Sequence, residues 1–219
     1  MSTFGYDGGV TTRRAELRHT REQSRERIIA AAESLVQRVP FAELTVDDVM
    51  REAGFGRTIF YRHFDDLPDL LMRAGREAID ELLDAQVAFS EARMGDGPEV
   101  VRSAIEPAVS VYQRHGPLLR AISEAAGVDE RISAGQNAIR ERFRELVEQA
   151  LRASGGLTID PSADLGEVAR ALNLMNEKYL LDAFGREARV SPETAIQTLS
   201  AIWLALIDGR AGGGGALAS

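Results

Sequence analysis

A polar tract in the first third of the chain carries side chains suited to binding phosphates and base edges. Arg57, Thr58, Tyr61 and Arg62 lie within residues 57–64, and His63 stands beside them. Arginine reaches guanine edges or phosphate oxygens, and threonine, tyrosine and histidine donate hydrogen bonds to phosphates. The pattern alone fits equally well an ordinary helical corner with a polar face, so both interpretations stay open at this point.

Two short helices with a glycine-containing turn between them are predicted to position this tract. Thr45 sits at the N-cap of the first helix, and Gly54 is placed to end it. The second helix is expected over residues 57–64, with Ile59, Phe60 and Phe64 pointing inward. This layout is typical of a helix-turn-helix, in which one helix lies in the major groove and the other braces it. The predicted DNA contacts are therefore Thr45, Arg57, Thr58, Tyr61, Arg62 and His63.

Residues 28–73 resemble the DNA-binding domain of the TetR family of bacterial repressors. The resemblance rests on LTVDDV at 44–49, AGF at 53–55, FYRHF at 60–64 and the leucine pair at 70–71. It implies a homodimer with an N-terminal three-helix DNA-binding domain and a C-terminal domain for ligand binding and dimerisation. A double-stranded DNA operator is then the expected partner.

Two positions depart from the family pattern. Gly56 stands where the family commonly has Ser or Thr at the N-cap of the recognition helix, and Leu67 stands where it usually has a Lys that touches the DNA backbone. Each departure removes a phosphate contact. We expect Arg57, Arg62 or the arginines of residues 13–21 to supply the missing charge.

The charge of the chain is unevenly distributed. The net charge is −8, yet residues 1–65 carry ten arginines and ten acidic residues, so the acidity belongs to the later part. Six arginines and three glutamates lie within residues 11–27. We expect residues 1–20 to be a disordered basic arm, which either contacts phosphates or is a solvated tail, because local field matters more than total charge.

Apolar periodicity along the chain predicts an all-α fold of about nine helices. We expect a DNA-binding domain over residues 21–66, a ligand-binding and dimerisation domain over 67–210, and a flexible tail over 211–219. The later helices are expected from 67 to about 89 and at 99–114, 117–126, 131–153, 163–184 and 192–208. Cysteine is absent and no apolar run is long enough for a membrane span, which fits a reducing cytoplasm.

The tract ALNLMNE at residues 171–177 places two amides on a largely apolar surface. Asn173 and Asn176 are three residues apart and share a helix face. A buried, unpaired amide costs roughly 1–3 kcal/mol, so each needs a backbone carbonyl, a water or a small molecule as partner. The amides could simply bridge helices in the core, and Trp203 could be a core residue.

The same tract resembles the corresponding helix of one TetR-family member, where it faces a long apolar ligand tunnel and an Asn hydrogen-bonds a ligand carbonyl. This resemblance implies a small apolar effector, carbonyl-bearing by analogy. The implied ligand contacts are Asn176, Asn173, Trp203, Tyr112 and Leu180.

The last two helices are also the expected dimer surface. Small and apolar residues on the last helix permit close helix packing, so two such pairs would form a four-helix bundle with two-fold symmetry. The predicted interface residues are Ala195, Leu199, Ile202 and Leu206.

An enzyme is the competing interpretation, and the sequence offers little for it. The three histidines, His19, His63 and His115, have no neighbouring cysteine, and no H-E-x-x-H or G-x-S-x-G motif occurs. Glu177 beside Asn176 could act as a base, but a solvated or helix-bridging glutamate explains it as well. We predict no enzymatic activity, no cofactor and no metal. Repression and activation of transcription both remain open.

Overall fold

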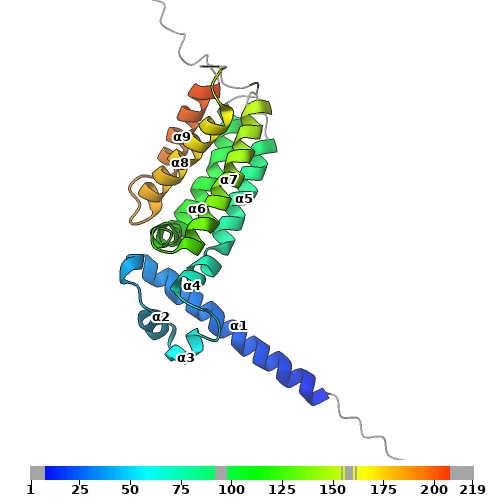
Figure 1. Cartoon of the computed structure of the whole chain (residues 1–219), viewed down its shortest axis with the longest axis vertical. Coiled ribbons are helices and arrows are strands. Elements are labelled where there is room, and N and C mark those ends of the chain that lie inside the picture. Colours follow the sequence, from blue (N-terminus) through cyan, green and yellow to red (C-terminus); the bar gives the residue numbers. More distant parts are fainter. Residues whose placement is uncertain (1–7, 92–97, 154, 156–159, 161, 208–219) are drawn as a thin grey trace, which may run out of the picture. The chain divides into compact units, whose positions relative to one another are not determined.

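A computed structural model describes residues 8–91, 98–153, 155, 160 and 162–207, which form helices joined by short turns (Figure 1). Nine α-helices and one short 3-10 helix occur in these residues, and none of them forms a strand. The all-α prediction is confirmed. The chain divides into two compact units, Met1–Ala74 and Gly75–Ser219.

The first unit contains α1 (Gly8–Val36), the 3-10 helix η1 (Phe41–Glu43), α2 (Val46–Ala53), α3 (Arg57–Phe60) and α4 (Leu67–Ala74). Helix α1 packs on α2 and α4, and α2 packs on α3. Leu70 and Leu71 of α4 are fully buried, as is Ile28 of α1. The unit therefore extends to Ala74, beyond the predicted boundary at residue 66, because α4 completes its core.

Helix α1 starts earlier than expected. Its backbone is helical from Gly8, whereas residues 1–20 were expected to be disordered. The reason is that residues 13–27 consist largely of Arg, Glu, Ala and Gln, and adding such residues to an existing helix needs no new nucleation. Residues 1–7 of the predicted arm and the predicted tail at 211–219 lie outside the described residues.

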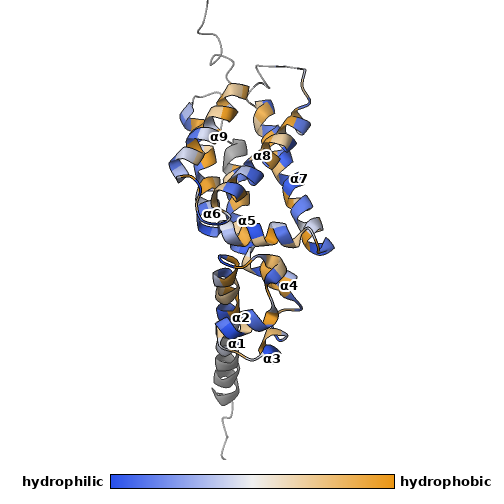
Figure 2. Ribbon diagram, turned by 90° about the vertical axis from the view of Figure 1, so that its left-hand side faces the viewer, coloured by the Kyte–Doolittle hydropathy of each residue, from blue (hydrophilic) through white to orange (hydrophobic). Residues whose placement is uncertain are grey.

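The second unit contains α5 (Arg76–Glu91), α6 (Pro98–Ala125), α7 (Glu130–Ala153), α8 (Leu165–Phe184) and α9 (Pro192–Ile207). Helix α5 packs on α6 and α7, α8 packs on α6 and α7, and α9 packs mainly on α6. Figure 2 shows apolar and polar residues alternating along these helices. Their apolar faces form one core that includes Val101, Val147, Leu180 and Trp203.

Two helix predictions in this region are wrong. Residues 99–114 and 117–126 form the single helix α6, with Pro107 and Pro117 inside it. A proline inside a helix costs about 3 kcal/mol or more, but Leu118, Leu119 and Ile122 beyond Pro117 are buried, and their packing offsets that cost. The continuous helix expected from residue 67 is interrupted at Gly75, which separates α4 from α5.

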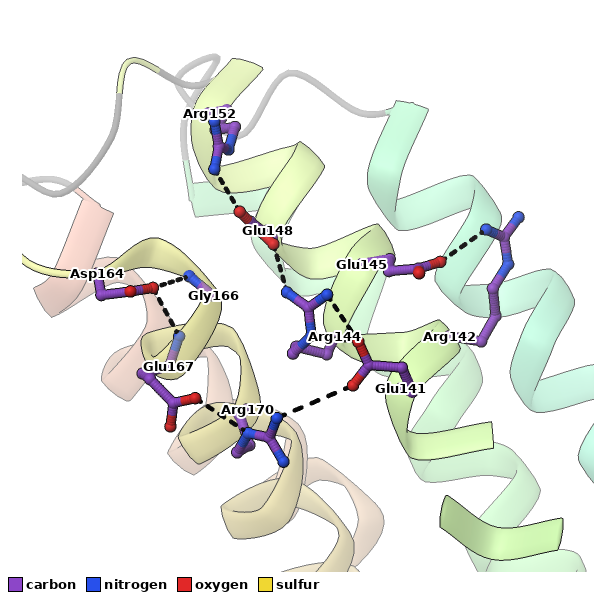
Figure 3. Close-up of polar contacts among 10 residues, drawn as sticks. All are labelled: Glu141, Arg142, Arg144, Glu145, Glu148, Arg152, Asp164, Gly166, Glu167 and Arg170. Carbon is purple, nitrogen blue, oxygen red and sulfur yellow. Dashed lines mark hydrogen bonds and ion pairs between the residues drawn. The ribbon is translucent and has the colours of Figure 1, made fainter. Parts of the chain in front are cut away.

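A row of alternating charges follows the surface of α7 and reaches α8 (Figure 3). Glu148 pairs with both Arg152 and Arg144, and Arg144 pairs with Glu141. Arg170 of α8 approaches Glu141 at 3.9 Å. Arg152, Glu141 and Arg170 are about half exposed or more, so the pairs that end on them add about 0–1 kcal/mol each, whereas Arg144 and Glu148 are only 20% and 19% exposed. Within the described part of the chain, no helix is long and apolar enough to cross a membrane.

Candidate DNA interface and ligand cavity

The caps of α2 are those predicted from the sequence. The backbone N–H of Asp48 donates to Thr45 Oγ1 at 3.1 Å, which closes the N-terminus of the helix. Gly54 ends the helix with φ 72°, a left-handed conformation that favours glycine. The Thr45 hydroxyl also donates to the Asp48 carboxylate. Since Thr45 is occupied in this cap, its contact with DNA stays a prediction.

The recognition element is shorter than predicted, and four of its five predicted polar side chains between residues 57 and 63 are exposed. Helix α3 ends at Phe60, and residues 61–63 form a turn instead of further helix. Phe60 and Phe64 are buried, and their rings pack with centroids 5.6 Å apart. The outward-facing residues are Arg57, Thr58, Tyr61 and Arg62, all exposed.

Arg57 is held on this exposed face by two neighbours. Its Nη1 donates to Asp47 Oδ1 at 3.0 Å, and its Nη2 donates to the Tyr61 hydroxyl at 3.0 Å. The bond to Tyr61, and then the bond to Asp47, raises the pKa of the Arg57 guanidinium. Because a guanidinium has five N–H donors, Arg57 keeps donors for a base edge or a phosphate while its position is fixed.

The structure corrects the prediction for His63, which is half-buried against α1 and does not face outward with the other residues. Its Nε2 lies 2.9 Å from the Ser24 hydroxyl, which is also within hydrogen-bond distance of the carbonyl of Arg21. Either His63 Nε2–H or the Ser24 hydroxyl can be the donor of the bond between them, depending on the tautomer of the ring. This nitrogen positions the turn after α3 and is not free to bind a phosphate.

Sequence reasoning missed Arg27 of α1. Its Nη2 donates to the Ala53 carbonyl at the end of α2 at 2.7 Å, and its guanidinium stacks on the Phe55 ring at 4.4 Å. Arg27 thus fixes the turn between α2 and α3 from a third helix. No local pattern indicates this role, because the contact spans 26 residues.

The second unit contains a cavity of about 110 Å³ that is lined by residues from all five of its helices. Ile105, Ala108 and Phe143 are typical of its mostly apolar wall. All five predicted ligand contacts line it: Tyr112, Asn173, Asn176, Leu180 and Trp203. Burial, followed by the charge of Glu177, raises the pKa of the Tyr112 hydroxyl, which keeps it neutral.

The two amides differ in their bonding. Trp203 Nε1 donates to Asn176 Oδ1 at 3.4 Å, so this amide bridges α8 and α9. Asn173 Nδ2 is buried and has no hydrogen-bond partner. The cavity also has polar residues that the sequence did not reveal, namely Gln86, Gln136 and Arg140. Arg140 of α7 pairs with Glu177 of α8, so Glu177 bridges two helices, which is one of the interpretations left open for it above.

The predicted dimer residues separate into two groups. Ala195 and Leu199 are buried in the core of their own unit, so their prediction as interface residues is wrong. They occupy the inner face of α9, because that helix packs on α6. Ile202 is 37% exposed and Leu206 is half-buried, so both stay candidates for an interface.

Each of the two units contains a region that matches a known protein family. Residues 28–73 match the family described as bacterial regulatory proteins, tetR family, and residues 101–209 match the C-terminal domain of the transcriptional regulator EthR. The HTH-type transcriptional regulator EthR of Mycolicibacterium smegmatis is 30% identical over 191 residues, covering 83% of this chain and 85% of that protein. EthR of Mycobacterium tuberculosis H37Rv is 25% identical over 186 residues, covering 84% of this chain and 86% of the other.

Solved structures agree on the fold. The TetR family transcriptional regulator PfmR from Thermus thermophilus superposes with a TM-score of 0.65 at 19% identity, covering 83% of this chain and 95% of PfmR. SmeT, described as the repressor of the Stenotrophomonas maltophilia multidrug efflux pump SmeDEF, gives 0.63 at 20% identity, covering 84% and 91%.

A helix-turn-helix with exposed arginines, followed by a separate helical unit with an internal apolar cavity, defines a DNA-binding transcriptional regulator. The chain belongs to the TetR family, and its C-terminal region is of the EthR type. The member that residues 171–177 resemble is EthR. Regulators of this family act on transcription and are not enzymes.

Proposed function

We propose that the protein is a ligand-responsive repressor that binds a palindromic operator as a homodimer and is released by a small apolar effector. The observation that carries this proposal is the outward-facing group Arg57, Thr58, Tyr61 and Arg62, which stands on a buried base of Phe60 and Phe64. The proposal is further supported by the largely apolar cavity in the second unit.

A two-fold dimer would place two recognition helices about 34–36 Å apart, one turn of DNA, which requires a palindrome. The test is selection of duplexes from a randomised pool by the purified protein, followed by mobility-shift titration of the selected DNA. We expect two inverted half-sites. Enrichment of no sequence at moderate salt would exclude an operator-binding function.

The exposed apolar residues of α8 and α9 support the dimer. Leu174 of α8 is 46% exposed and Ile202 of α9 is 37% exposed, and the two helices contact each other. Ala171, Ala201 and Ala205 are exposed on the same pair of helices and would allow close approach of a second copy. This face replaces Ala195 and Leu199 in the proposed interface.

The effector is expected to bind in the cavity and shift the protein toward a state with lower DNA affinity. At about 110 Å³ the cavity is smaller than the 300–1,000 Å³ typical of ligand pockets, so a larger effector must displace side chains. This displacement gives the effector different affinities for two states, which a population shift requires. Because Asn173 Nδ2 is a donor without a partner, we expect the effector to carry an acceptor such as a carbonyl.

Thermal-shift screening of apolar carbonyl compounds tests this part of the proposal. A hit should also release the protein from its selected DNA, and its shift should fall in Asn173→Ala and in Asn176→Ala. A shift that survives both substitutions would remove the amides from the proposed role. Reporter expression in a deletion strain separates repression, which raises expression on deletion, from activation.

A further inference from the structure

The cavity of the second unit carries no uncompensated charge among its described lining residues. Arg140 of α7 and Glu177 of α8 are the charged members of this lining. Arg140 Nε donates to Glu177 Oε2 at 2.8 Å and Arg140 Nη2 donates to Glu177 Oε1 at 2.7 Å, a bidentate pair whose side chains are 35% and 21% exposed. A charged effector would have to break this pair or stay unpaired in an apolar wall, and both are costly. The lining therefore selects for a neutral molecule.

Two polar atoms of the same lining lack hydrogen-bond partners. They are Gln86 Oε1 on α5, an acceptor, and Asn173 Nδ2 on α8, a donor, and both are buried. Buried polar groups in proteins nearly always have a partner, so two unpartnered atoms on residues that line one cavity need an explanation. A ligand that supplies both partners would satisfy the two atoms at once.

We infer that the effector is a neutral molecule with one hydrogen-bond donor and one acceptor, as in a secondary amide, and that Gln86 is a binding residue that accepts from its donor. This inference rests on the proposed ligand response and adds to it the effector class and a contact on α5. Asn173 donates to the acceptor of the same molecule, and the apolar wall covers the rest.

Unliganded protein gives the first test. Gln86→Leu keeps the side-chain volume and removes the unpartnered oxygen, so the melting temperature without effector should rise by at least about 2 °C. Gln136→Leu is the matched control, because Gln136 lines the cavity and is not among the residues with an unpartnered buried atom. It should give no such rise. A melting temperature for Gln86→Leu equal to or below that of the native protein would mean that water already satisfies Gln86, and would overturn the inference.

Matched probes give the second test. N-cyclohexylbenzamide has an N–H donor, cyclohexyl benzoate replaces it with oxygen, and 4-cyclohexylbenzoate is an anion. The amide should bind the native protein at least about tenfold more tightly than the ester by calorimetry. This preference should disappear in Gln86→Leu and persist in Gln136→Leu.

Equal binding of amide and ester, preference for the anion, an unchanged preference in Gln86→Leu, or binding of none of the probes would each overturn the inference. These failures are distinguishable from failure of the proposed function. Selection of an inverted repeat by the unliganded protein, and release from it by any cavity ligand, would leave the repressor proposal intact.

Discussion

Gly56 precedes the recognition helix and has the backbone of a helix N-cap without the side chain of one. Its φ is −80° and its ψ is 153°, and no side chain closes the N-terminus of α3. A Cβ on Gly56 would have no heavy atom within 4 Å, so the site has space for a side chain. This position, where the family commonly has Ser or Thr, therefore has both the backbone conformation and the space for either side chain.

We predict that Gly56→Ser strengthens DNA binding and slightly stabilises the protein. The serine hydroxyl would accept from an N–H of α3, which adds a few tenths of a kcal/mol over glycine, and would reach a phosphate when DNA binds. The measurements are mobility-shift affinity on the selected operator and melting temperature. Gly56→Ala, which adds carbon without a hydroxyl, should improve neither; equal gains from alanine and serine would contradict the argument.

His63 should make the stability of the protein depend on pH just below neutrality. Burial, and then the charges of Arg21, Arg25 and Arg62, lower the pKa of its imidazole from 6.5. The unfolded chain therefore binds the proton more tightly than the folded chain, so stability is retained above the unfolded pKa and lost as the pH falls below it.

The predicted result is a fall in melting temperature between about pH 7.5 and about pH 5.5 that is smaller in His63→Gln. The carboxylates of Asp48 and Glu52 do not interfere, because their pKa values are lowered from 3.8 and 4.5 and lie below this window. Identical pH profiles for the native protein and His63→Gln would show that the ring titrates as it does in the unfolded chain.

At the scale of elements, local signals and tertiary packing differ in what the sequence can reveal. The bounds of α2 followed from Thr45 and Gly54, because caps act on neighbouring backbone groups. The continuity of α6 did not follow, since Pro117 is a local stop signal that buried residues on both sides of it override.

The same difference between local sequence signals and tertiary contacts applies to the candidate site. The exposed residues of α3 and the amides of α8 each lie on one helix, so periodicity with family resemblance could predict that the first are exposed and the second line a cavity. Their contacts with DNA and effector stay predictions. Arg27 and the pairing of Arg140 with Glu177 were missed, because each contact joins residues far apart in the sequence. Gln86 was missed because its place in the cavity lining depends on how five helices pack together. His63 was misplaced because the helix that holds it was predicted too long.

The crossing of α6 with the end of α8 depends on a residue without a side chain. Gly116 is buried in α6, and a Cβ there would overlap the carbonyl oxygen of Phe184. We predict that Gly116→Ala lowers stability by about 1–3 kcal/mol through overpacking. Urea unfolding of the two proteins measures the difference.

Gly166→Ala is the control for this substitution. Gly166 is also a buried glycine in a helix of the second unit, but its Cβ would meet side-chain atoms of Arg144 and Asp164 at 3.1 Å, and not a backbone carbonyl. Its effect should be clearly smaller. Equal losses of stability from the two substitutions would mean that the loss comes from replacing any buried helical glycine, and not from contact with the Phe184 backbone.

At the scale of the whole molecule, the two units differ in charge and in exposed apolar surface, which indicates that they have different roles. Residues 1–65 balance their charges and carry the exposed arginines of the recognition element, whereas the acidity lies in the remainder. An acidic unit does not attract DNA, so the favourable interaction with phosphates must come from the N-terminal unit. The second unit contributes its cavity and the exposed apolar residues of α8 and α9.

The last prediction concerns the assembly. A charge on the proposed α8–α9 face would be buried without a partner in a dimer, so Ile202→Arg should yield monomers. Light scattering after size exclusion should then give a mass near 23.9 kDa instead of twice that value. Because one half-site holds a monomer weakly, the affinity for the full palindrome should fall by at least about tenfold.

Val128→Arg is the matched control, since Val128 is 81% exposed in the turn between α6 and α7, away from α8 and α9 in the sequence. It should leave both mass and affinity unchanged. A dimeric Ile202→Arg protein, or a monomeric Val128→Arg protein, would place the interface elsewhere. A monomeric Ile202→Arg protein with native affinity would instead mean that a single copy of the protein recognises its half-site without a second copy.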